Sequence, residues 1–130
     1  INGSDKRTTF MIRNIPNKYT LDMLRDFLDA TNKGTYDFLY LRFDFTNKCN
    51  AGYAFINFIK PTSVVPFIKE RVGKIWNKFN SEKLCDISYA KIQGKRSLIA
   101  KFRNSNVMAQ DISFRPIIFY SSGSHQGEEE

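Results

Sequence analysis

The stretch NAGYAFINF, at residues 50–58, constrains the fold of this chain more than any other segment. Its aromatic and β-branched residues favour a β-strand, in which successive side chains point to opposite faces. One face of such a strand is purely apolar and suits a protein core. The other face carries Tyr53, Phe55 and Asn57, so two large aromatic rings need an explanation if that face meets water.

Hydrophobic patterning predicts three more strands and two helices around this stretch. We expect strands near residues 8–14, 36–45 and 83–93, and helices near residues 19–34 and 61–79. The order strand, helix, strand, strand, helix, strand is that of the split βαβ, or ferredoxin-like, arrangement. The predicted fold is therefore α+β, with both helices on one face of a four-stranded antiparallel sheet. Tyr53 and Phe55 lie on the other face, to which neither helix is assigned.

Both helices carry local signals. Thr20 is a good N-cap for the first helix, and Gly34 is a good stop. In the second helix, Pro66 lies in the first turn, where its missing N–H costs little, whereas Gly73 weakens the middle by about 1 kcal/mol relative to Ala and leaves room for a break there. Apolar residues of this second helix recur at steps of three and four: Val64, Ile68, Val72, Ile75, Trp76 and Phe79.

The sequence after the fourth strand predicts a short third helix near residues 95–104. Leu98, Ile99 and Phe102 form an apolar stripe along it, and the rest of its surface is basic. We divide the whole chain into an N-terminal tail, one domain, an extension that packs back on the domain, and a disordered acidic tail: residues 1–7, 8–105, 106–120 and 121–130.

The basic composition favours an anionic partner. The chain has 20 Lys and Arg residues against 13 Asp and Glu residues, which gives a formal net charge of +7. RNA, DNA and an anionic membrane surface all stay open on charge alone. No apolar run approaches the roughly 20 residues that are needed to span a bilayer.

The residue patterns of enzymes and metal sites do not occur in the sequence. The one histidine, His125, lies in the predicted tail, and we find no phosphate loop, Ser/His/Asp grouping or metal-ligand spacing. Cys49 and Cys85 show neither CxxC spacing nor a disulfide framework, which favours a reducing intracellular compartment, with Cys85 as a small buried hydrophobe. We therefore predict a protein that is not an enzyme and has no catalytic residues, metal ligands or cofactor.

Two motifs carry a resemblance to a known family. AGYAFINF, residues 51–58, resembles the RNP octamer of RNA recognition motifs, and FMIRNI, residues 10–15, resembles the companion hexamer of that family. Both motifs lie on the expected strands, and the resemblance covers residues 9–93. Ala51 stands where the octamer usually has Lys or Arg, and Met11 stands where the hexamer usually has an aromatic residue.

The wider sequence is similar to a narrower group. Four segments resemble the C-terminal RNA recognition motif of the Mei-two-like meiosis regulators of fungi and plants: TTFMIRNIPNKYT, DFTNKCNAGYAFINF, KIWNKFNSEKLCDISYAKIQGK and LIAKFRNS. This resemblance implies a fragment of a longer protein of the nucleus and cytoplasm that promotes meiosis. It also implies a single-stranded RNA partner, either non-coding or messenger RNA.

The family resemblance implies that RNA bases stack on Tyr53 and Phe55. Each stack on an aromatic ring contributes about 1–3 kcal/mol to binding. The other candidate RNA-binding residues lie beside these rings, at the strand ends or at the start of the third helix: Met11, Arg13, Tyr40, Asn57, Ser88, Lys91, Gln93, Lys95 and Arg96. For Arg13 the alternative is a solvated charge at the sheet edge, and for the basic helix it is an ordinary solvated face.

Two other kinds of binding stay open. If the C-terminal segment or a partner covers Tyr53 and Phe55, the domain is a protein-interaction module that uses its helical face or its C-terminal extension. Membrane binding through the basic helix would need exposed large apolar residues, whereas the apolar stripe of that helix packs more simply on the sheet or the second helix. The accessibility of the two rings therefore distinguishes RNA binding from protein binding.

Overall fold

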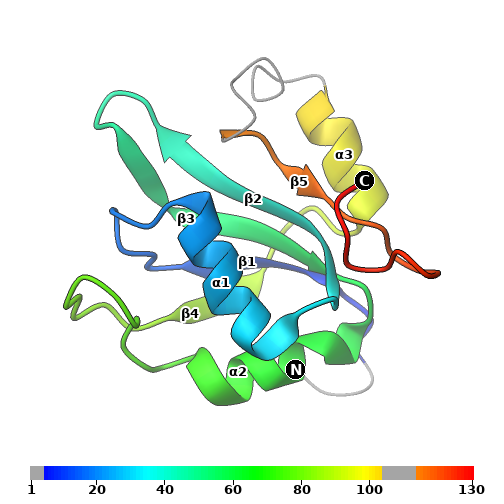
Figure 1. Ribbon diagram of the computed structural model, residues 1–130, viewed down its shortest axis with the longest axis horizontal. Coiled ribbons are helices and arrows are strands. Elements are labelled where there is room, and N and C mark those ends of the chain that lie inside the picture. Colours follow the sequence, from blue (N-terminus) through cyan, green and yellow to red (C-terminus); the bar gives the residue numbers. More distant parts are fainter. Residues whose placement is uncertain (1–4, 104–113) are drawn as a thin grey trace.

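The computed structural model describes residues 5–103 and 114–130 and shows the predicted α+β arrangement (Figure 1). Its elements are, in chain order, β1 (Thr9–Arg13), α1 (Leu21–Asn32), β2 (Tyr36–Asp44), β3 (Cys49–Phe58), the short 3-10 helix η1 (Pro61–Val64), α2 (Val65–Arg71), β4 (Asp86–Tyr89), α3 (Lys95–Arg103) and β5 (Ile117–Ile118). The ferredoxin-like prediction is confirmed. The antiparallel sheet has one strand more than expected, because β5 joins it in the order β4–β1–β3–β2–β5.

Helix α1 begins where the sequence provides a cap. The Thr20 hydroxyl accepts a hydrogen bond from the Met23 N–H at 3.3 Å, which satisfies one of the free N–H groups of the first turn. Leu24, Phe27 and Leu28 form the buried stripe of the helix. They pack on the inward-facing side chains of β1, β2 and β3, and this contact forms the main core.

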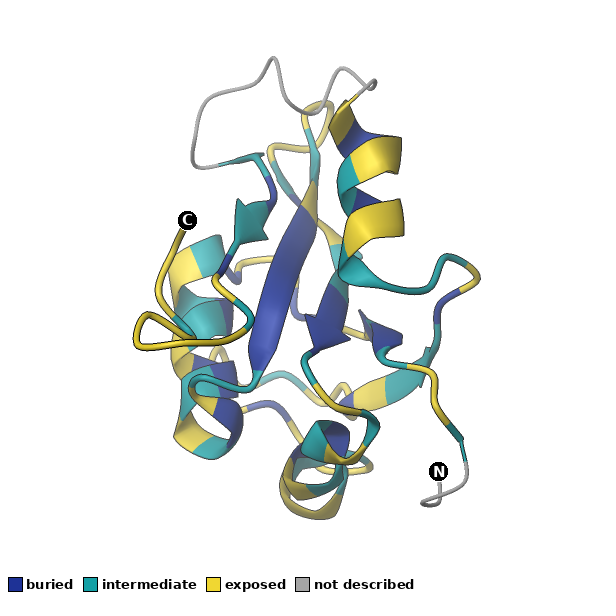
Figure 2. Cartoon of the chain, turned by 90° about the vertical axis from the view of Figure 1, so that its right-hand side faces the viewer, coloured by how far each residue is buried: buried dark blue, intermediate teal, exposed yellow. Residues whose placement is uncertain are grey.

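Strand β2 is buried on both of its faces, which sets it apart from its neighbours. Leu39 and Leu41 belong to the main core beneath α1, whereas Phe38 and Tyr40 pack on the opposite side against Leu98 of α3. The buried run along β2 is the long dark-blue strand in Figure 2. The sheet is therefore sandwiched between two helical layers at β2.

The second helix is much shorter than the apolar stripe predicted. Helix α2 ends at Arg71, and Gly73 has a φ of +82°, a conformation that favours glycine. The Gly73 N–H then donates to the Cys85 carbonyl at 2.8 Å, and Ile75 bridges to Leu84, so the chain turns back as a hairpin. Our prediction of helix up to residue 79 was wrong, because these backbone pairs replace helical ones.

Residues 114–130 contain an ordered turn where a disordered acidic tail was expected. After β5 has paired with β2, the chain folds back, and two acidic side chains form ion pairs with the domain. Glu129 lies 2.7 Å from Arg25, and Glu130 lies beside Lys95. Parts of the predicted tail, domain end and extension lie outside the described residues: 1–4, 104–105 and 106–113.

Both cysteines are free thiols, in line with the sequence. Cys85 is 1% exposed and belongs to the main core, and burial raises the pKa of its thiol to about 12. It acts there as a small buried hydrophobe, as predicted. Within residues 5–103 and 114–130, no helix is long and apolar enough to cross a membrane.

A buried hydrogen-bond cluster, the Asn57 network, links β1, β2 and β3 to the C-terminal segment. The Asn57 Oδ1 atom accepts from the hydroxyls of Thr8 and Thr9 at 2.8 and 2.7 Å. The Asn57 Nδ2 atom donates to Asp37 at 2.8 Å, and the Ser121 hydroxyl donates to the other Asp37 oxygen at 2.9 Å. Burying such polar groups is tolerated because each of them has a partner.

We expect Asn57→Ala to lower the free energy of unfolding by about 2–3 kcal/mol, because it removes the hydrogen bonds that the Asn57 amide makes with Asp37 and with the hydroxyls of Thr8 and the buried Thr9. Denaturant unfolding measures this change. Asn17→Ala is the matched control, because Asn17 is exposed, and it should have little effect. Equal effects of the two substitutions would contradict the structural role of the Asn57 network.

Candidate nucleic-acid interface

Four of the predicted RNA-binding residues form a row across the sheet face that is opposite α1 and α2. Strand register makes Ser88 the partner of Met11, Met11 the partner of Phe55, and Phe55 the partner of Tyr40. Four adjacent strands thus contribute one residue each. We call this set the central row.

A second row lies next to it, toward the C-terminal end of β1. Arg13 pairs in register with Tyr53 on one side and with Asp86 on the other. The Arg13 Nε atom donates to the Ser88 hydroxyl at 3.0 Å, so the guanidinium lies between the two rows. Asp86 was not among the predicted site residues, although strand alternation already placed it on the same face as Ser88.

Helix α3 covers the β2 end of the central row. The Phe102 ring lies with its centroid 5.9 Å from that of Phe38, 4.9 Å from that of Tyr40 and 6.0 Å from that of Phe55. Tyr40 is 5% exposed, and this burial raises the pKa of its hydroxyl. Tyr40 points to the predicted face, but it contacts α3, and a base would reach it only if α3 moved.

The remainder of the face is open at β1, β3 and β4. Tyr53, Phe55 and Met11 are half-buried, and Arg13 is exposed. The Tyr53 and Phe55 rings meet edge to face, with centroids 5.9 Å apart. The open surface is thus a strip, defined here by Met11, Arg13, Tyr53, Ser88 and the uncovered part of Phe55.

Three of the predicted RNA-binding residues have structural roles instead. Asn57 is 4% exposed, and its amide is used within the Asn57 network. The Gln93 side chain accepts from the N–H groups of Thr8 and Thr9 and donates to the Ala90 carbonyl. Its amide is therefore occupied.

Lys95 is the third, because its ammonium group holds the C-terminal segment. The Nζ atom donates to the Phe119 carbonyl at 2.6 Å and to the Ser121 hydroxyl at 3.0 Å, and it also contacts Glu130. The sequence pattern placed Lys95 on a basic helix face, and it gave no sign that the acidic end of the chain lies against that face.

The other predicted basic residues, Lys91 and Arg96, are exposed. Lys91 lies in the connection between β4 and α3, and Arg96 lies in the first turn of α3. Within the described parts of the chain, neither side chain forms an ion pair. Both are available to an anion.

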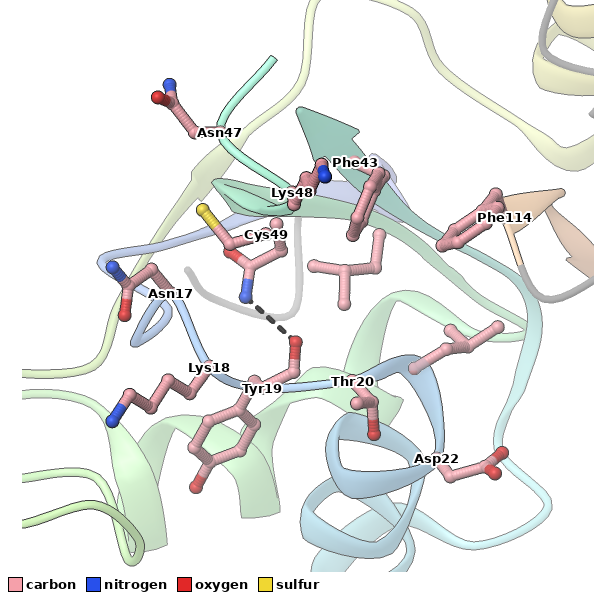
Figure 3. A pocket seen from close by; sticks show the side chains of 13 residues that line it. Asn17, Lys18, Tyr19, Thr20, Asp22, Phe43, Asn47, Lys48, Cys49 and Phe114 are labelled. Atoms are coloured by element: carbon pink, nitrogen blue, oxygen red, sulfur yellow. Dashed lines mark hydrogen bonds between the residues drawn. The ribbon is translucent and has the colours of Figure 1, made fainter. Parts of the chain in front are cut away.

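The hollow in Figure 3 lies apart from the open strip. Its volume is about 580 Å³, and it lies between the start of α1 and the turn from β2 to β3. Leu41, Phe43 and Phe114 contribute apolar walls, and the buried Asn50 amide donates to the Tyr19 carbonyl at 3.0 Å. Leu41 faces the main core, so this hollow opens on the helical side of the sheet.

Metal binding finds no support in the part of the chain that the structure describes. No group of three or more His, Cys, Asp or Glu residues there is placed to hold an ion. His125 pairs with Glu128 at 2.8 Å, remote in sequence from both rows.

Comparison with known proteins assigns the family. The family model of RNA recognition motif 2 matches residues 7–103, which include both rows and α3. The chain belongs to this RNA recognition motif family. The match agrees with the octamer on β3, the hexamer on β1 and the observed topology.

Curated relatives within the family are similar over nearly the full chain. Meiosis protein mei2 of Schizosaccharomyces pombe is 66% identical over 128 residues, which are 98% of this chain and 17% of the relative. Protein MEI2-like 1 of Arabidopsis thaliana is 57% identical over 130 residues, which are 100% of this chain and 14% of the relative. The chain thus spans about a sixth of the length of these relatives.

A solved structure agrees in fold. The Rna15 RNA recognition motif with bound RNA (GU) has a TM-score of 0.55 and 18% sequence identity, and the match covers 75% of this chain and 97% of that chain. At this identity the likeness supports the architecture alone.

We expect Phe102→Ala to uncover Tyr40 and to lower the free energy of unfolding by about 3 kcal/mol, because it removes a buried ring. The Tyr40 pKa should then fall back toward its ordinary value of about 10. Ultraviolet absorbance titration measures this shift when the profile of the matching Tyr40→Phe protein is subtracted. Arg96→Ala, on the exposed side of α3, is the control. An unchanged Tyr40 pKa in Phe102→Ala would contradict the burial of Tyr40 by the Phe102 ring.

Proposed function

We propose that this domain binds single-stranded RNA on the open strip of its sheet, without catalysis and without a cofactor. The observation that carries the proposal is the position of Tyr53, half-buried in the row that it shares with Arg13. A nucleobase has an apolar face that stacks on such a ring, and a guanidinium beside the ring attracts the phosphate or an edge of the base.

The small number of uncovered rings on the strip limits how many bases can stack there. Tyr53 and the uncovered part of Phe55 offer stacking surfaces, and the thioether of Met11 adds a polarizable apolar contact between β3 and β4. Tyr40 is excluded from direct stacking as long as Phe102 lies on it. Lys91 and Arg96 extend the site with positive charge for the phosphates.

The relatives support a narrower role for the whole protein. A relative at 66% identity is named a meiosis protein, and we propose that the full-length protein is an RNA-binding regulator of meiosis. Non-coding RNA is the proposed ligand, with messenger RNA as the other candidate. The proposed location is the nucleus and the cytoplasm, where such RNA is made and used.

A protein-interaction module is the second candidate function. It is favoured by the packing of α3 on Phe38 and Tyr40, because rings that are buried under a helix are not available for stacking with bases. In this alternative, the helical face or the C-terminal segment binds a peptide and the rows have a purely structural role. The two candidates differ in what the loss of the Tyr53 ring does.

We expect Tyr53→Ala to weaken the binding of single-stranded RNA by about ten-fold, which corresponds to the loss of one base stack. Fluorescence anisotropy with a labelled random RNA pool measures the affinity, and a duplex of the same length tests the preference for single strands. Tyr120→Ala is the matched control, because Tyr120 is an exposed ring that lies outside both rows. Circular dichroism checks that both variants are folded.

A Tyr53→Ala protein that binds RNA as tightly as the wild type would contradict base stacking at this ring. A wild-type domain that binds no single-stranded RNA would favour the protein-interaction module. Phe55→Ala is the less direct test, because the Phe55 ring also packs near Phe102 and its loss affects stability.

The affinity should fall with rising salt, with a log–log slope of about 0.7 for each phosphate contact on a single strand. The double substitution Lys91→Gln/Arg96→Gln should reduce that slope by up to about 1.4, the sum for two contacts. Lys60→Gln/Lys69→Gln removes the same charge from exposed positions around η1 and α2 and should leave the slope nearly unchanged. Equal changes in both double variants would mean that only the net charge matters.

A further inference from the structure

A small hollow lies where two connections of the domain meet, beyond the Arg13 end of the open strip. Its volume is about 240 Å³, and it lies between the segment that follows β1 and the hairpin that precedes β4. The side chains and backbone of both connections line it: Pro16, Asn17, Lys18, Phe79, Ser81 and Lys83. None of these residues was among the predicted RNA-binding residues.

The Phe79 ring is held in this hollow by a strained turn. Phe79 has a φ of +65° and Asn80 has a φ of +49°, in the left-handed region that asparagine tolerates and a bulky ring rarely adopts. The Phe79 side chain is nevertheless 46% exposed. Neither burial nor backbone preference explains a phenylalanine at this position.

Backbone pairs at the base of the hairpin and one ring contact hold the turn. The hairpin that carries it is closed by the Ile75–Leu84 bridge and by the backbone pair of Lys74 with Cys85 at 2.8 Å. The inner edge of the Phe79 ring packs on Tyr19, with ring centroids 5.8 Å apart at 70°. A ring held by such contacts suits a stacking ligand, because less ordering is needed on binding.

The charge around the ring is positive. Lys18 and Lys83 are exposed, they come from the two different connections, and they form no ion pair within residues 5–103 and 114–130. A hollow lined by an apolar ring and two exposed lysines matches a ligand that is both planar and anionic. A nucleotide has both properties, because its base stacks and its phosphate pairs with lysine.

The walls of the hollow lie close in the chain to the second row. Pro16 follows Arg13 by three residues, and Lys83 precedes Asp86 by three, so each wall begins within about 10 Å of the second row. The Asn14 amide donates to the Leu84 carbonyl at 3.0 Å, and this hydrogen bond links the segment that follows β1 to the segment that precedes β4. A strand that leaves Tyr53 past Arg13 therefore has only a short distance to cover to the walls of the hollow.

We propose that this hollow is an additional nucleotide subsite, in which Phe79 stacks the base and Lys18 and Lys83 hold the phosphate of the nucleotide that follows the open strip. This inference rests on the proposed RNA binding, because the strand on Tyr53 brings the next nucleotide to the hollow. It extends the site from the sheet face to the connections at the sheet end.

The test compares Phe79→Leu with the wild type on two random pools of single-stranded RNA. The short pool fits the open strip only, and the longer pool also reaches the hollow. Leucine keeps the apolar contact with Tyr19 and removes the flat ring, and circular dichroism checks the fold. Fluorescence anisotropy should show a loss of about five-fold or more on the longer pool, the lower end of one base stack, and little loss on the short pool.

A second test changes the charge of the hollow and leaves the packing of Phe79 on Tyr19 unchanged. Lys18→Gln/Lys83→Gln should weaken binding of the longer pool and reduce its salt slope by up to about 1.4. Lys69→Gln/Lys78→Gln is the matched control, because both lysines are exposed nearby and neither lines the hollow. Photo-crosslinking of the longer RNA, read by mass spectrometry, should label the peptide that contains Phe79.

The outcomes separate the two proposals. If Tyr53→Ala weakens binding while Phe79→Leu and Lys18→Gln/Lys83→Gln bind both pools like the wild type, the subsite is overturned and RNA binding on the strip stands. If the wild type binds neither pool, RNA binding itself fails. If a labelled polyglutamate peptide binds in a Phe79-dependent way and RNA does not, the hollow takes an acidic protein segment and the nucleotide assignment is overturned.

Discussion

The packing of Phe102 on Phe38 and Tyr40 is the contact on which the candidate interface depends. It creates a second, smaller core on the face that the topology alone would leave open, and it buries β2 from both sides. A ring in such a core is a poor partner for a base, because stacking there would first have to break protein contacts. The same contact that stabilises α3 on the sheet therefore leaves only the β4, β1 and β3 side of this face open.

The Asn57 network helps to hold α3 on the sheet through a chain of hydrogen bonds. Its Asp37 oxygen accepts from Ser121, and Ser121 in turn accepts from Lys95 at the first residue of α3. Hydrogen bonds in such a chain are stronger inside the protein than in water, and each of them has a partner that would be left unsatisfied. The start of α3 and the C-terminal segment are thus positioned by the sheet itself.

Local patterns predicted the strands, the topology and the face that carries Tyr53 and Phe55, because alternation and spacing determine these features. They failed where distant segments decide the outcome. Ile75 and Phe79 fit a helical stripe, yet backbone pairing after Gly73 turns the chain into a hairpin and exposes both side chains. The alternation placed Asn57 on the correct face, but only the tertiary structure shows that Asp37 and two hydroxyls occupy its amide.

Strand β5 has a consequence for how the domain behaves toward other copies of itself. The edge of a sheet offers free N–H and C=O groups that template pairing with another chain, and proteins protect such edges. Ile117 and Ile118 pair with Leu39 and Phe38, in the most apolar part of β2, and so they cover that part of the longer edge. The other edge, β4, is four residues long and begins with the charged Asp86. The C-terminal segment thus shortens the unpaired edge of β2, the edge that would otherwise offer its most apolar backbone to another chain.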